Sequence, residues 1–170
     1  MKKFALILTI IMSLAVSKNV IAQGTIVDVA VGNKDFSTLV TALKAADLVG
    51  ALQGEGPFTV FAPTNDAFAK IDPNTLGSLL EEKNQKALAN ILTYHVIAGK
   101  IAATDVVSAL EKGKGTVELK ALNGQVLTVV QKDGKIWLKD LNGNYSEIVA
   151  TDVMGSNGVI HVINTVVMPN

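Results

Sequence analysis

Two histidines, His95 and His161, are the side chains best suited to move protons near neutral pH. With an aspartate and Ser108, Ser146 or Ser156, either could form a Ser-His-Asp arrangement, yet no serine lies in a Gly-x-Ser-x-Gly sequence. Each histidine belongs to an apolar segment, a setting typical of a hydrogen-bonded structural residue. The sequence therefore predicts no catalytic residue and no enzyme, and a hydrolase is kept only as a remote alternative.

The spacing of possible metal ligands is equally unfavourable. The chain has no cysteine and its two histidines are 66 positions apart, whereas metal ligands usually come in short-spaced groups. Asp140, Asn142 and Asn144 match the first, third and fifth positions of a calcium loop. The sixth position is Tyr145 instead of glycine and the twelfth is Thr151 instead of glutamate. We predict a polar connection between strands here, and no metal or cofactor.

The N-terminus has the parts of a secretory signal peptide over residues 1–22. Lys2 and Lys3 precede an apolar run, Phe4–Val16, and small residues lead to a cleavage point after Ala22. A run of thirteen residues is short for a bilayer span. We therefore predict export, with the mature protein periplasmic or secreted and no membrane span left after cleavage.

The composition of the chain argues against nucleic acid as a partner and against thiol chemistry. Without residues 1–22 the chain has 12 lysines, 15 acidic residues and no arginine, a formal charge of −3. Nucleic-acid binders need a basic face and favour arginine, so nucleic acid is not an expected partner. The absence of cysteine excludes thiol catalysis and thiolate metal sites. A chain of this length buries enough surface to be stable on its core alone.

The elements that must position these side chains change character along the chain. Apolar residues recur at helical spacing over 35–52, 83–96 and 103–110. From Gly115 the pattern alternates with period two, and Asn123-Gly124 and Asp133-Gly134 are strong hairpin signals. We expect further strands over 147–154, 158–163 and 165–169. The predicted class is α+β in one domain, residues 23–170, with a helical first half packed on a mostly antiparallel β wedge or small sandwich formed by the second half.

A polar corner interrupts the first half. The run Phe58–Ala62 alternates like a strand and ends at Pro63. Thr64 can cap the helix that follows through its hydroxyl, and Asp66 in the first turn favours the helix dipole. We interpret the corner as a structural joint.

Three separated stretches resemble the signature segments of one family. "FTVFAPTNDAF" (58–68), "ILTYHVIAGK" (91–100) and "NGVIHVINTVVMP" (157–169) are similar to those of the fasciclin, or FAS1, domain in order and spacing. The resemblance covers about residues 25–169. It implies the FAS1 fold, in which helices flank a strand wedge, and a bacterial exported single-domain protein without catalytic activity. It further implies adhesion to a cell-surface or matrix protein or polysaccharide.

The resemblance also suggests contact residues. Tyr94 and His95 match a Tyr-His pair that some family members have been proposed to use for receptor contact. Asp152 and Val153 lie where some animal members carry an Asp-Ile recognition element. His161, inside the third segment, belongs with Thr64 and Asp66 to the residues expected to be structural.

Three functional hypotheses result. The first is a secreted, non-catalytic adhesion or interaction module. The second is an extracytoplasmic carrier of a small apolar ligand, with a pocket between helices and sheet, motivated by the apolar composition of 49%. The third is the hydrolase. The sequence indicates neither the partner's identity nor an oligomeric state.

Overall fold

The computed structural model describes residues 24–170, so the predicted signal peptide, residues 1–22, lies outside the described residues. Its helices before the first long strand are α1 (Ile26–Gly32), α2 (Ser37–Ala45) and α3 (Val49–Gln53). Those that follow are α4 (Asn65–Phe68), α5 (Pro73–Leu79), α6 (Gln85–Tyr94) and α7 (Ala103–Lys112). Short 3-10 turns, η1 (Lys34–Phe36) and η2 (Glu82–Asn84), precede α2 and α6. No helix among the described residues has the length and apolar character needed to cross a bilayer.

Within residues 24–170 seven strands form one mixed sheet, in the order β2-β1-β7-β6-β5-β4-β3. They are β1 (Phe58–Pro63), β2 (Val96–Ala98), β3 (Thr116–Lys120), β4 (Val126–Lys132), β5 (Lys135–Lys139), β6 (Tyr145–Gly155) and β7 (Gly158–Ile163). Among the strand pairs of this part of the chain, β1 with β7 is parallel and the rest are antiparallel. The α+β class with a mostly antiparallel sheet is therefore confirmed.

The sheet differs from the prediction in two respects: which strands from the first half join it, and where its last strand ends. β1 and β2 come from the helical first half, and β1 lies inside the sheet between β2 and β7. The strand expected over 165–169 is wrong, because the chain leaves the sheet after β7. The edge strands β2 and β3 approach each other through a single bridge, Ile97 to Ala121, so the sheet curls round.

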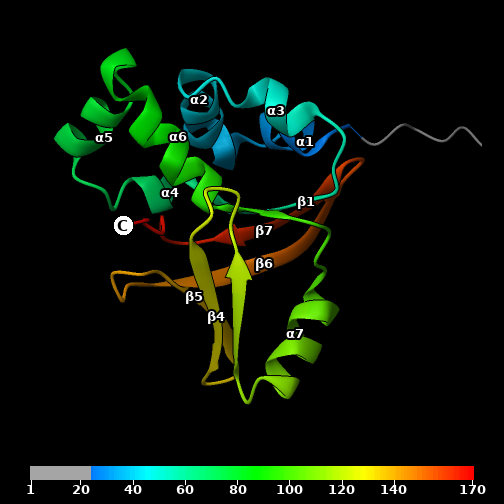
Figure 1. Cartoon of the computed structure of the whole chain (residues 1–170). Helices are drawn as coiled ribbons and strands as arrows, with labels where there is room; N and C mark the ends of the chain where they lie inside the picture. The colour runs from blue at the N-terminus through cyan, green and yellow to red at the C-terminus, as the bar shows by residue number, and fades with distance from the viewer. Residues whose placement is uncertain (1–23) are drawn as a thin grey trace, which may run out of the picture.

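Two apolar cores lie on opposite sides of β1. Val60 and Ala62 point to the layer of helices α1–α6 and share a core with Ile160. Phe61 points the other way, into a core that Tyr94 and residues of α7 and β3–β5 complete. This alternation is the period-two pattern of a strand buried on both faces. Figure 1 shows the helical layer at one end of the molecule and α7 apart from it, on the side of β3 and β4.

The predicted turns form as their sequences require. Gly124 takes a φ of +87°, and Asp133 and Gly134 take +54° and +74°. Two successive residues with positive φ match the tight turn that Asp-Gly favours. The hairpins β3–β4 and β4–β5 are thus confirmed.

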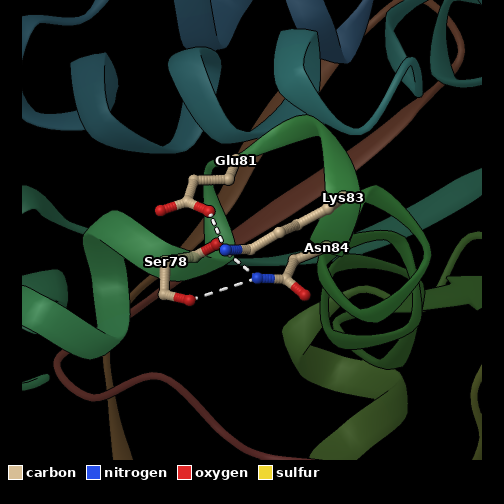
Figure 2. Close-up of polar contacts among 4 residues, drawn as sticks. All are labelled: Ser78, Glu81, Lys83 and Asn84. Carbon is tan, nitrogen blue, oxygen red and sulfur yellow. Dashed lines mark hydrogen bonds and ion pairs between the residues drawn. The ribbon is translucent and has the colours of Figure 1, made fainter.

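A charged junction joins α5 to α6. Asn84 Nδ2 donates to the carbonyl oxygen of Ser78 at 2.8 Å and to its Oγ at 3.1 Å. Lys83 Nζ lies 2.6 Å from Glu81 Oε2, and both side chains are largely exposed (Figure 2). The side-chain amide of Asn84 therefore holds the start of α6 against the end of α5. The exposed ion pair contributes little to stability.

Candidate interaction surface

The polar corner after β1 joins three elements. Thr64 Oγ1 accepts a hydrogen bond from Ala67 N at 3.3 Å at the start of α4, and Asp66 is exposed in the first turn. Asn65, which was not among the predicted structural residues, makes the longer-range bonds. Its Oδ1 accepts from Thr38 N at 2.9 Å, and its Nδ2 donates to Lys34 O at 2.9 Å. The corner thus holds the start of α2 against the end of β1.

Tyr94 and His95 are buried, with exposed fractions of 0% and 2%. The Tyr94 hydroxyl donates to Val126 O at 2.9 Å, and burial raises its pKa, with the charge of Asp140 as a second cause. In the folded domain both side chains are thus enclosed by the protein itself, and their contact with a partner stays a prediction. Tyrosine has an apolar ring and a hydroxyl that can form a hydrogen bond, so it suits both a buried and an exposed position. The sequence alone could not show which of the two Tyr94 occupies.

Both imidazoles are held by backbone groups on each side. His95 Nδ1 donates to Ile91 O at 2.8 Å, and its Nε2 accepts from Val167 N at 3.2 Å. His161 Nε2 donates to Ile101 O at 2.8 Å, and its Nδ1 accepts from Asp152 N at 3.4 Å. These partners fix one neutral tautomer for each ring. Neither ring has a nitrogen left to activate a nucleophile or bind a metal.

Asp152 and Val153 lie in an irregular part of β6. The pairing of β6 with β7 shifts between Ala150 and Val153, and Asp152 takes a φ of +58°. This bulge turns the Asp152 carboxylate to the start of α7, where its Oδ1 accepts from Ala103 N at 2.9 Å. Val153 packs half-buried against the helical core. Both residues therefore have internal contacts.

The pocket that the carrier hypothesis requires is nearly closed. The space between the helical layer and the sheet is lined by Ile26, Leu39, Leu52, Val60 and other apolar residues and measures about 20 Å³. That is room for about one water molecule and far below the several hundred Å³ of a ligand cavity. The described residues offer no apolar pocket there for a carried ligand.

Among the described residues, no helix covers one face of β3–β5 and the start of β6, whose side chains belong to neither core. The opposite face holds Leu127, Val129 and Leu138, which pack with α7 residues in the second core. Cross-strand pairing puts two rows of side chains on the uncovered face. The first row is Thr116, Val130, Trp137 and Glu147. The second row is Glu118, Thr128, Lys139 and Tyr145. We call these two rows, with Lys120, Lys132 and Lys135 on the same face, the open sheet face.

None of these side chains is fully buried, and Tyr145 is 47% exposed. A hollow of about 280 Å³ is lined by Lys132, Asp133, Trp137 and Tyr145. Tyr145 also lines a neighbouring hollow of about 700 Å³, together with Thr128 and Lys139 among others. Trp137 was not among the predicted site residues, although the alternation in "KIWLK" after the Asp-Gly turn puts it on the face opposite to that of the buried Leu138.

Comparison with known proteins gives concordant results. The family model described as the fasciclin domain matches residues 34–169. Protein sll1483 of Synechocystis sp. is 52% identical over 145 residues, which are 85% of this chain and 73% of that protein. The cell surface glycolipoprotein MPB83 of Mycobacterium bovis is 36% identical over 153 residues, 87% of this chain and 62% of that protein.

A solved structure shows the same fold. It is a FAS1 domain pair from the insect cell adhesion molecule fasciclin I, with a TM-score of 0.73 and 20% identity. The match covers 84% of this chain and 50% of that one. At this identity the likeness concerns the fold alone.

Proposed function

This chain belongs to the fasciclin domain family, and from that premise we propose that it is an exported, non-catalytic module that binds at the cell surface through its open sheet face. The observation that carries the proposal is the distribution of its polar groups. The motif residues Thr64, Tyr94, His95, His161 and Asp152 all hydrogen-bond inside the fold. The open sheet face instead presents aromatic and charged side chains to solvent.

The proposed location has two supports. One relative, MPB83, is named a cell surface glycolipoprotein. The other is the signal-peptide pattern of residues 1–22. Both favour an extracytoplasmic location. There the protein could bind the envelope, or a polymer or protein outside it.

The non-catalytic part of the proposal rests on the two histidines. Each has both ring nitrogens engaged by backbone groups, and the buried Ser146 exchanges hydrogen bonds with Thr165. A catalytic serine needs a base with a free nitrogen within hydrogen-bond reach. This arrangement supports a binding function over hydrolysis.

The test is sedimentation of the purified protein with intact envelope material from its own host, over a range of protein concentrations. We expect saturable binding at a micromolar Kd, and a loss of about tenfold or more in the Trp137→Ala/Tyr145→Ala double variant. The matched control is Val31→Ala/Val107→Ala, which trims two exposed side chains on α1 and α7. Equal binding by the two double variants, or no binding by the wild type, would contradict the proposal.

A further inference from the structure

Positive charge is concentrated in the strands of the open sheet face. Residues 112–139 contain six lysines and two acidic residues, a formal charge of +4. The other described residues, 24–111 and 140–170, contain six lysines and thirteen acidic residues, a formal charge of −7. A protein that is acidic as a whole therefore presents a basic block within one supersecondary unit, which favours an anionic partner at that block.

Four of these six lysines point to the open sheet face, whereas Lys112 ends α7 and Lys114 precedes β3. Lys135 and Lys139 share the strand parity of Trp137, Lys132 pairs with Lys135, and Lys120 pairs with Val126. Lys135 Nζ forms an ion pair with Glu147 Oε1 at 2.7 Å. The ion pairs formed within residues 24–170 include none of Lys120, Lys132 and Lys139. These three ammonium groups are therefore available to an external anion.

Aromatic rings lie beside two of these charges. Lys139 Nζ is 5.8 Å from the centre of the Tyr145 ring. Lys132 shares the hollow of about 280 Å³ with Trp137 and Tyr145. The Trp137 Nε1 atom is covered and finds no acceptor among the described residues. Each hollow thus combines an aromatic ring, a lysine and hydrogen-bonding groups.

We propose that the open sheet face binds an acidic polysaccharide. Its sugar rings stack on Tyr145 and Trp137, and its carboxylate or sulfate groups pair with Lys132 and Lys139. The C–H faces of a sugar ring are apolar and carry a slight positive potential, so they suit the negative face of an aromatic ring. The proposal deepens the function proposed above and rests on it.

The composition of the face favours this occupant over two others. The core of a protein–protein interface is depleted of charged residues, whereas Lys135, Lys139 and Glu147 surround Trp137 here. A membrane-binding surface presents protruding apolar side chains, whereas Trp137 is half-buried within the face, among threonines and lysines. A polymer that carries both hydroxyl and anionic groups satisfies all of these side chains.

The experiment uses the tryptophan itself. Trp137 is the only tryptophan in the chain, so intrinsic fluorescence reports on this face without a label. The protein is titrated with polygalacturonate, with dextran sulfate and with neutral dextran. We expect a saturable change in emission with at least one anionic polymer and none with dextran, and an apparent Kd that rises with salt. The response to the two anionic polymers separates carboxylate from sulfate as the recognised group.

Three variants locate the site. We expect Lys132→Gln/Lys139→Gln to raise the apparent Kd about tenfold and Tyr145→Ala about fivefold. The control Lys44→Gln/Lys86→Gln removes the same charge from exposed positions of α2 and α6 and should change the Kd less than about twofold. Equal effects of the two lysine pairs would overturn the proposal by showing unspecific charge attraction. An unchanged Kd in Tyr145→Ala would overturn the stacking that it requires.

Other partners give different outcomes. Binding to anionic phosphatidylglycerol vesicles without binding to either anionic polymer would overturn the polysaccharide proposal in favour of a membrane surface. Envelope binding that is lost in the Trp137→Ala/Tyr145→Ala variant, without binding to either polymer, would overturn it while leaving the proposed function standing. Absence of binding to the envelope and to both polymers would overturn both.

Discussion

The Nε2 atom of His95 accepts a hydrogen bond from the backbone N–H of Val167, which lies 72 positions later in the chain. His95 directly follows α6 as its C-terminal cap, and the His95 carbonyl oxygen accepts from Phe61 N of β1 at 2.8 Å. One buried histidine therefore connects a helix, a central strand and the C-terminal segment. That position gives His95 a structural role inside the domain.

This histidine should make the stability of the domain depend on pH. Burial lowers the pKa of His95 from 6.5 to about 4. Because the unfolded chain binds the proton more readily than the folded one, the stabilisation is complete above about pH 6.5 and is lost as pH falls toward 4. We expect a loss of about 3 kcal/mol over that range, measured by urea unfolding at several pH values.

The matching variant is His95→Gln, which keeps a neutral hydrogen-bonding side chain. It should be less stable than the wild type near pH 7, by about 1–3 kcal/mol, because the Val167 N–H loses its partner or its geometry. Between about pH 6.5 and 5, where few carboxylates titrate, its stability should be nearly flat. A slope as steep as that of the wild type would assign the pH dependence to other groups.

Asp152 provides a second stability test. Its carboxylate caps α7 and its φ of +58° is unfavourable for most residues. We expect Asp152→Ala to cost about 2 kcal/mol, since the cap is lost and alanine is strained there. Asp152→Gly should cost about 1 kcal/mol, because the strain is relieved. Asp152→Asn should stay within about 0.5 kcal/mol in urea unfolding, because it keeps both the acceptor and the tolerance of this φ. A destabilised asparagine variant would show that the charge, and not the cap, matters.

The sequence predicted the local features of the fold and missed the long-range ones. Asn123-Gly124 and Asp133-Gly134 indicated both hairpins, because turn chemistry lies within a few residues. The parallel pairing of β1 with β7 joins residues about 100 positions apart, and no local pattern reports it. The same holds for the curl that brings Ile97 to Ala121.

The segment 165–169 shows why a pattern can mislead. Its β-branched apolar residues predicted a strand, and Val166 and Val167 are buried. Its backbone N–H groups, however, donate to side chains instead of a neighbouring strand: Thr165 to Ser146, Val167 to His95 and Met168 to Asp140. These apolar residues are therefore explained by their burial in the core and not by pairing with a neighbouring strand. The open sheet face was missed for a similar reason, since only the tertiary structure shows that no helix covers it.

Replacement by alanine should change the stability of the domain in opposite directions at two glycines, Gly158 and Gly77. A Cβ at Gly158 would lie 2.3 Å from the carbonyl oxygen of Phe58, a backbone atom of the paired strand β1. Gly158→Ala should therefore destabilise by several kcal/mol, about 3 or more. A Cβ at Gly77, in α5, meets nothing within 4 Å, so Gly77→Ala should stabilise by about 0.5–1 kcal/mol. Thermal unfolding of the pair measures both, and a neutral Gly158→Ala would show that β1 and β7 can separate.

The loop that begins at Asp140 resembles a calcium site, but we expect it not to bind calcium. The buried Asp140 carboxylate already accepts from Asn142 N at 2.9 Å, from Asn144 N at 2.8 Å and from Met168 N at 3.2 Å. With its oxygens taken by N–H donors, it has no free lone pairs directed at a cation. We expect neither calcium at about 5 mM nor a chelator to move the unfolding temperature. Asp140→Ala should cost about 2–4 kcal/mol, because three backbone donors lose a charged acceptor, whereas the exposed control Glu82→Ala should stay within about 0.5 kcal/mol. Stabilisation by calcium that disappears in Asp140→Ala would show instead that the loop exchanges these N–H donors for a metal ion.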